Sequence, residues 1–373
     1  MPITLPAHSP RTRSLTGVVP EMFRSLQGAG DWLRPARSAI LVMLDGVGAA
    51  QLRARAGHAR FLASLAGPRE IARTTFPSTT ASALTTLLTG TDPGAHGMVG
   101  YRVRVPETGR IANLLHGWED GDLPDDWQRA VPLTRSPSGT GSAYVVSKPD
   151  FATTGFTRGT TDGAEFIGVS DVGERIARAG AVAAQHPGSF IYLYVPELDG
   201  IGHRVGWESA AWTDELERVD GALRDLVRAA PQAGVLITAD HGMVDVSAHR
   251  HVLLDDGDAR LEGVAQIAGE PRMLHLYTHP QSADAVAGVW RAAEGERAWV
   301  MTRGEAIASG VFGTVDESVA PRIGDVLIAA RARVAYYDNR LADTSAQRMV
   351  GQHGSLTLDE AVVPLLRAGA YAG

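Results

Sequence analysis

The chain has 373 residues, with 35 lysine and arginine residues against 42 aspartate and glutamate residues, so its formal net charge is −7. Hydrophobic residues make up 44% and charged residues 21% of the chain, a composition that predicts a folded protein with a large core and excludes a disordered or collagen-like chain. The acidic balance argues against bulk binding of nucleic acid. Cysteine is absent, which excludes disulfides, thiol nucleophiles and cysteine-ligated metal centres.

The first residues show no secretory signal, and no segment approaches the roughly 20 consecutive apolar residues that a membrane-spanning helix needs. We therefore expect a cytoplasmic protein that has no membrane partner. The first element that the pattern predicts is a short helix near Val19–Leu26.

Three segments have the continuous apolar character of strands that are buried on both faces of a parallel sheet, and each has an aspartate close behind it. Helical spacing of apolar residues follows over Val172–Gln185 and Ala210–Ala230. This alternation predicts an α/β fold with a doubly wound, mostly parallel central sheet and helices on both faces. The three strand segments are SAILVMLDG (Ser38–Gly46), SFIYLYVPELDG (Ser189–Gly200) and AGVLITADHG (Ala233–Gly242).

Two stretches interrupt the alternation. Residues 101–165 are rich in glycine, proline, serine and threonine, and we expect a loop-rich excursion over the strand ends. Residues 246–325 contain short alternating apolar segments, which predict a small α+β insertion, or cap, with its own antiparallel sheet. Because no repeat or linker divides the chain, we expect residues 1–373 to form a single catalytic domain.

Aspartate and histidine recur just beyond the predicted strands. Because ligands of such sheets bind beyond the carboxyl ends of the strands, we expect the three aspartates to converge there. Three carboxylates and three imidazoles suffice for two divalent-ion sites with three protein ligands each, and zinc accepts both ligand types. Two ions would leave a net charge of +1, which attracts an anion such as a phosphate ester. These residues are Asp45, Asp199, His203, Asp240, His241 and His353.

A candidate nucleophile lies in FPSTTASALTTLLTG, which spans Phe76–Gly90. Proline and serine end an extended stretch, and a helix is predicted to begin at Thr79 or Thr80. A hydroxyl at a helix N-terminus lies near free backbone N–H groups and the positive end of the helix dipole, which favour an alkoxide and a bound phosphate oxygen. The alternative is an ordinary threonine N-cap that only stabilises the helix.

This series of motifs resembles the alkaline phosphatase superfamily, specifically its nucleotide pyrophosphatase/phosphodiesterase branch. The resemblance is carried by LDG, LLTG, HGMVGY, YVPELDGIGH, ADHGM and GQHG, which are spread over most of the chain. It implies two divalent ions, with Zn²⁺ as the default and Mn²⁺ or iron as alternatives. One ion would be held by Asp199, His203 and His353. The other would be held by Asp45, Asp240, His241 and Thr80.

The resemblance also implies roles for single residues. The family places its nucleophile ten residues before the glycine that ends the helix, which is Thr80 in this sequence. Thr79 is its register neighbour, and the Thr-Phe-Pro string would instead select Thr75. Tyr101 stands where phosphodiesterases of this branch usually have an asparagine that binds a phosphate oxygen. We expect its phenol to donate to that oxygen or its ring to form a substrate wall; a packed loop tyrosine is the alternative.

The implied activity is that of a metal-dependent phosphodiesterase or nucleotide pyrophosphatase with a small phosphate ester or nucleotide-like substrate. Lys148 is the single lysine of the chain and lies in the 101–165 excursion. If Lys148 reaches the phosphate, a phosphomonoesterase is favoured; if it is solvated, the diester interpretation holds. A phosphonate hydrolase is a third chemistry on the same site. The alternative from another class is a metal-binding protein that has lost catalysis.

Overall fold

An eight-stranded sheet organises the protein, seen here in a computed structural model that describes residues 5–6, 12–135 and 141–372. Strands β2, β6, β7, β8 and β9 are parallel, whereas β18 is antiparallel to both of its neighbours. The predicted α/β fold with a mostly parallel central sheet is confirmed. In order across the sheet, the strands are β1 (Arg13–Ser14), β3 (Ile71–Arg73), β18 (Val362–Gly369), β9 (Ala233–Thr238), β2 (Ser38–Leu44), β8 (Phe190–Val195), β6 (Ala143–Ser147) and β7 (Glu165–Gly168).

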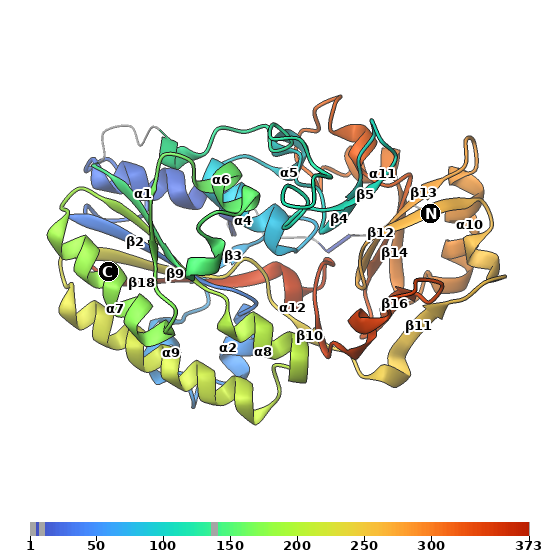
Figure 1. Ribbon diagram of the computed structural model, residues 1–373. Coiled ribbons are helices and arrows are strands. Elements are labelled where there is room, and N and C mark those ends of the chain that lie inside the picture. The colour runs from blue at the N-terminus through green and yellow to red at the C-terminus, as the bar shows by residue number, and fades with distance from the viewer. Residues whose placement is uncertain (1–4, 7–11, 136–140, 373) are drawn as a thin grey trace.

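Helices cover both faces of this sheet (Figure 1), and every residue of β2 is buried as a result. One face carries α1 (Val18–Leu26), α4 (Thr80–Thr89) and α6 (Gly155–Thr161). In the described residues, no helix has the length and apolar character needed to cross a bilayer. The other face carries α2 (Ala49–Ala54), α3 (Arg60–Leu65), α7 (Val172–Gln185), α8 (Glu197–Val205) and α9 (Ala210–Ala229).

The two long helices follow the predicted bounds closely because their ends carry clear signals. Asp171 precedes α7, and its side chain accepts a hydrogen bond from the backbone N–H of Glu174. Ser209 caps α9 in the same way. The apolar residues of α9 that recur at three- and four-residue spacing, among them Leu216 and Leu223, are fully buried.

The 101–165 segment differs from the expected excursion in one respect. It contains the hairpin of β4 (Arg102–Arg104) and β5 (Ile111–Asn113) and long loops, but also β6 and β7 of the central sheet. The sequence of β6, AYVVS, has only five residues between glycine-, serine- and proline-rich flanks, so its apolar run is too short to stand out.

A second, smaller sheet forms the cap on the right of Figure 1. It is antiparallel, with α10 (Ala283–Glu294) and α11 (Arg303–Ala308) packed on it. The predicted 246–325 segment contains most of this unit, but β15 and β16 continue it to Asp338. Its strands are β12 (Val264–Glu270), β13 (Met273–Thr278), β14 (Ala298–Thr302) and β15 (Val326–Ala330); β11 (His251–Leu254) pairs separately with β16 (Ala335–Asp338).

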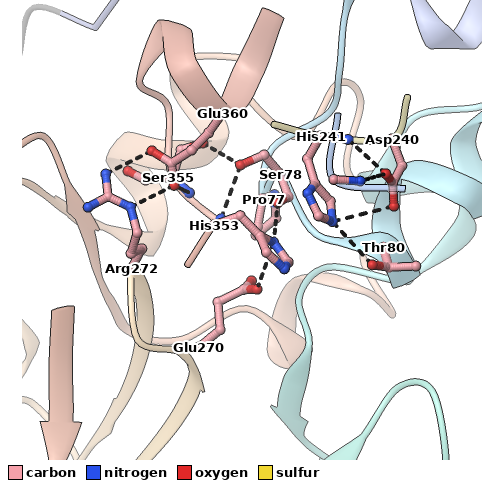
Figure 2. Close-up of polar contacts among 12 residues, drawn as sticks. Pro77, Ser78, Thr80, Asp240, His241, Glu270, Arg272, His353, Ser355 and Glu360 are labelled. Atoms are coloured by element: carbon pink, nitrogen blue, oxygen red, sulfur yellow. Dashed lines mark hydrogen bonds and ion pairs between the residues drawn. The ribbon is translucent and has the colours of Figure 1, made fainter. Parts of the chain in front are cut away.

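A buried ion pair joins the cap to the central sheet (Figure 2). Arg272, in the turn between β12 and β13, donates Nε to Glu360 Oε1 and Nη2 to Glu360 Oε2, both at 2.8 Å. Glu360 lies on α12 (Leu358–Ala361), directly before β18. The backbone N–H of Ser355 donates to the same carboxylate at 3.0 Å. The loop between β17 (Gly351–Gln352) and α12 is thereby tied to both parts of the protein.

Candidate active site

Three aspartates converge at the carboxyl edge of the central sheet. Asp45 directly follows β2, Asp240 lies two residues beyond β9, and Asp199 is in the first turn of α8 after β8. They meet because β2 lies between β8 and β9, with Leu44 beside Val195 in the pairing register. The predicted convergence of the strand ends is therefore what the structure shows.

Gly46 allows the aspartates to approach one another. Its backbone N–H donates to Asp240 Oδ1 at 3.2 Å, and its φ is +74°, in the left-handed region. A Cβ at this position would lie 2.9 Å from Asp199 Oδ1. Glycine is required here because any other residue would be strained at this φ, and its side chain would displace the Asp199 carboxylate.

Three histidines surround the aspartates, and each has one ring nitrogen committed to a backbone carbonyl. His203 Nδ1 donates to Gly351 O at 2.8 Å, His241 Nδ1 donates to Gly242 O at 3.0 Å, and His353 Nδ1 donates to Ser78 O at 2.9 Å. A carbonyl oxygen can only accept, so Nδ1 carries the proton in each ring. The lone pair of Nε2 is then left for a metal ion, as is usual for metal-binding histidines.

The donor atoms are close enough to hold divalent ions. Two groups have ligand atoms that all lie within 4.8 Å of one another: Asp45, Asp240 and His241 form one, and Asp199, His241 and His353 form the other. His203 Nε2 lies 3.3 Å from Asp199 Oδ2 and its ring centre lies 5.1 Å from that of His353, so it borders the second group.

The carboxylates themselves fit a metal centre. Asp45 Oδ1, Asp199 Oδ1 and Asp240 Oδ2 are buried and have no hydrogen-bond partner. Buried carboxylate oxygens without a partner carry a large desolvation cost unless a cation balances them. Three such oxygens beside three Nε2 atoms form the oxygen–nitrogen donor set that zinc accepts.

Electrostatics in the cluster point the same way. Burial and the neighbouring Asp240 and Asp199 carboxylates raise the pKa of Asp45 well above its usual range. Burial lowers the pKa of His353, and the neighbouring His241 and His203 lower it further. Although burial favours the neutral ring, Asp199 and hydrogen bonding to it raise the pKa of His203. Carboxylates this close together are the arrangement that a divalent cation relieves.

Thr80 is the first residue of α4 and faces this cluster (Figure 2). Its Oγ1 lies 3.2 Å from His241 Nε2. The preceding loop is fixed to the late histidine, because Ser78 N–H donates to Gly354 O at 3.1 Å while Ser78 O accepts from His353. Thr79 is the N-cap of α4, yet its side chain makes no capping hydrogen bond. The geometry thus places the hydroxyl of Thr80 beside these candidate metal ligands.

A known protein family matches the part of the chain that contains this cluster. The family described as "Type I phosphodiesterase / nucleotide pyrophosphatase" matches residues 39–356, a range that includes all of these side chains. The chain belongs to this family. It is accordingly a metal-dependent phosphoester hydrolase of the alkaline phosphatase superfamily. The cytoplasmic location stays a prediction.

Solved structures share the fold of this phosphodiesterase-family chain. Murine ectonucleotide pyrophosphatase/phosphodiesterase 5 is 19% identical, with a TM-score of 0.67 over 89% of this chain and 88% of its own. Phosphonoacetate hydrolase from Sinorhizobium meliloti 1021 is also 19% identical, with a TM-score of 0.67 over 90% of this chain and 91% of its own. No curated protein sequence matches significantly. At this identity the likeness supports the fold alone.

Two other residues with predicted roles lie outside the metal-ligand set. Tyr101 lines a cavity of about 120 Å³ together with Glu270 of the cap. Lys148 Nζ lies 3.2 Å from Glu197 Oε1, and the fully buried Arg175 donates to the same oxygen at 2.6 Å. Neither Tyr101 nor Lys148 is among the described residues that line the cavity beside Thr80. Their roles in substrate binding stay predictions.

Sequence reasoning missed two residues that contact the cluster. The phenol of Tyr194 donates to Asp45 Oδ2, which leaves Oδ1 as the free oxygen. Glu270 Oε2 lies 3.6 Å from His353 Nδ1, and its carboxyl group also accepts from the side chain of Thr79. Tyr194 could have been found from its place in the strand before Asp199, whereas Glu270 comes from the cap and has no local signal.

Proposed function

We propose that this family member is a phosphodiesterase that uses Thr80 as its nucleophile and a two-metal site. Asp45, Asp240, His241 and Thr80 Oγ1 would hold one ion, and Asp199, His203 and His353 the other, with zinc as the default metal. The observation that carries the proposal is the set of unpartnered carboxylate oxygens and unprotonated Nε2 atoms around the hydroxyl of Thr80, which lies 3.2 Å from His241 Nε2.

The assignment of His203 differs from the closest grouping of donor atoms, in which His241 is shared by both sets. His203 Nε2 is directed at Asp199, and its Nδ1 proton is already committed to Gly351 O. A ligand role for His203 therefore needs only that its Nε2 lone pair and Asp199 take up the same cation. His203 is therefore assigned with Asp199 and His353, which gives the second ion three protein ligands.

Bound divalent ions would supply Lewis acidity at the phosphate and at the attacking and leaving oxygens. The chain supplies the nucleophile and its orientation. Thr80 Oγ1 forms a bond to phosphorus while the bond to the leaving oxygen breaks, and its proton passes to solvent. The first backbone N–H groups of α4 have no partner within the helix and can donate to a phosphate oxygen. The leaving oxygen takes up a proton from solvent and departs as an alcohol. Water then attacks phosphorus and the bond to Thr80 Oγ1 breaks, which gives a monoester and restores the threonine hydroxyl.

The structurally similar proteins support this chemistry at the level of substrate class. The murine phosphodiesterase is known as an inactive threonine-to-alanine variant in complex with AMP. The Sinorhizobium enzyme has been solved with phosphonoacetate and with phosphonoformate. Phosphonate hydrolysis is accordingly the second candidate, with phosphomonoester hydrolysis beside it. The intact donor set argues against a binding protein that has lost catalysis.

Turnover of bis-p-nitrophenyl phosphate, p-nitrophenyl phosphate and phosphonoacetate by protein of measured metal content tests the proposal. Thr80→Ala should lower diester turnover by at least about 10³-fold, because the nucleophile is lost. The matched control is Thr79→Ala on the neighbouring residue, which should retain turnover within about tenfold. Near-wild-type turnover by Thr80→Ala, with two ions still bound, would show that the nucleophile lies elsewhere.

A further inference from the structure

A cavity of about 320 Å³ opens from the nucleophile into the protein. It shares Asp45, Thr80 and Asp199 with the candidate active site. Thr80, Leu84 and Leu88 all line it, and residues four apart lie on one face of a helix. The cavity therefore runs along α4 for two helical turns, away from the metal-ligand set. Its volume is at the lower end of the roughly 300–1,000 Å³ of small-molecule sites.

The walls of this cavity are mostly apolar. Four threonines besides Thr80 also line it, Thr154, Thr157, Thr160 and Thr161. The hydroxyls of Thr160 and Thr161 donate to the backbone oxygens of Phe156 and Thr157, at 2.8 and 2.7 Å, and that of Thr154 donates to Thr157 Oγ1 at 2.9 Å. Three of these four threonines therefore have no hydroxyl proton left for a ligand. The apolar lining residues include Leu84, Leu88, Leu115, Phe151, Phe156 and Phe166.

The cavity lacks the groups that a second phosphate would need. Its only charged lining residues in the described chain are the aspartates of the metal-ligand set, with the imidazole of His116 beside them. Lys148 follows the lining residue Ser147 but is held by Glu197 at 3.2 Å. A group that carries its own negative charge would thus be buried here without a partner cation, which is costly.

Two hydroxyls on one wall are without hydrogen-bond partners. Ser147 Oγ and Tyr192 Oη are buried, and both residues line the cavity. They share a face of the sheet, because β6 and β8 are parallel neighbours and Val145, two residues before Ser147, pairs with Tyr192. These two hydroxyls could satisfy one or two polar atoms of a ligand, but not the several hydrogen-bonding groups on the edge of a nucleobase.

We infer that the substrate is a phosphoester whose organic group is uncharged and apolar, an aliphatic chain or a simple aromatic ring, and that this group occupies the cavity along α4. The inference rests on the proposed function, in that the phosphorus reacts at Thr80. A nucleoside is the competing occupant that the same reaction would allow.

Binding of n-alkylphosphonates from methyl to octyl tests this inference by titration calorimetry on metal-loaded protein. The phosphonate group should bind beside Thr80, where the phosphate of a substrate would react. Each methylene that enters the cavity should then tighten binding about fourfold, the factor that matches about 0.8 kcal/mol per buried CH₂. The rise should end when the cavity is full. AMP should bind more weakly than octylphosphonate.

Two variants test whether the alkyl chain of the ligand occupies the cavity along α4. Leu88→Phe narrows the far end of the cavity, so the rise in affinity should end at a shorter chain. Leu87→Met is the matched control, because Leu87 is fully buried in the core but does not line the cavity. The wild-type series needs neither variant, so a folding defect in Leu88→Phe leaves the test intact.

Affinity that does not depend on chain length, or AMP binding tighter than octylphosphonate, would overturn the inference. These measurements do not require turnover. If the protein hydrolyses diesters but its phosphonate affinity does not depend on alkyl chain length, only the inference of an apolar substrate is refuted. If affinity rises with chain length but the protein hydrolyses no ester, only the proposed function is refuted.

Discussion

Replacing Arg272 with methionine should destabilise the protein through a single buried carboxylate. Both side chains of the Arg272–Glu360 pair have no solvent exposure. Arg272 also donates Nη1 to the carbonyl oxygens of Ala332 and Val334, each at 2.9 Å. Arg272→Met therefore leaves a fully buried carboxylate without its cation, and two carbonyl groups lose a donor.

The expected cost is about 3–5 kcal/mol of unfolding free energy, the range for breaking a buried ion pair by removing one partner. The double variant Arg272→Met/Glu360→Gln removes the stranded charge and should recover at least about 2 kcal/mol of that loss. An exposed arginine of the same cap, Arg291, pairs with Glu305, and Arg291→Met should cost less than about 1 kcal/mol.

Denaturant unfolding of chelated protein measures these differences, because metal binding would otherwise add its own stabilisation. A second readout is zinc affinity, since Ser355 is held by Glu360 and lies two residues after His353. We expect Arg272→Met to weaken zinc binding as well. The reasoning would be refuted if Arg272→Met lowered the unfolding free energy no more than Arg291→Met does. It would also be refuted if Arg272→Met/Glu360→Gln were less stable than Arg272→Met.

Three other predictions follow from the site. Chelation should remove two ions per chain and lower the unfolding temperature, because unpartnered carboxylate oxygens then remain buried; elemental analysis and calorimetry before and after EDTA check this. Lys148→Ala should leave the ratio of bis-p-nitrophenyl phosphate to p-nitrophenyl phosphate turnover unchanged within about twofold, because Glu197 holds the ammonium group; a selective loss of monoester turnover would place Lys148 at the phosphate. Burial lowers the pKa of His96 to about 3. Its neutral form therefore stabilises the fold fully above about pH 6.5, and about 1.4 kcal/mol should be lost per pH unit below that; His96→Gln should flatten this slope in unfolding experiments from pH 7 to 5.

The positions of the candidate metal-ligand aspartates were predictable in part, because a general rule applies to them. Parallel strands bring their carboxyl ends to one edge, so an aspartate after each of three buried strands is expected at that edge. That the three strands are also neighbours, with β2 between β8 and β9, is visible only in the structure. The hydroxyl at the start of α4 was predictable for a similar reason, since proline, serine and threonine before a small-residue run mark a helix start.

The support around these ligands could not be read from the sequence. His353 Nδ1 is oriented by the carbonyl of Ser78, which is 275 positions away, and a backbone oxygen carries no residue-specific signal. Glu270 reaches the same histidine from the cap, whose packing on the sheet depends on the whole fold. Tyr101 was placed by resemblance alone, and its position in the cavity beside Glu270 is set by the hairpin that follows it.

The position of β18 has a consequence for how the protein is made. This strand, Val362–Gly369, lies inside the sheet between β3 and β9, although it is synthesised after all of the others. Until residue 369 has left the ribosome, β9 has an open edge and β3 has no link to the sheet interior. Until then the sheet is incomplete, and the unpaired backbone groups along the edge of β9 can pair with another chain.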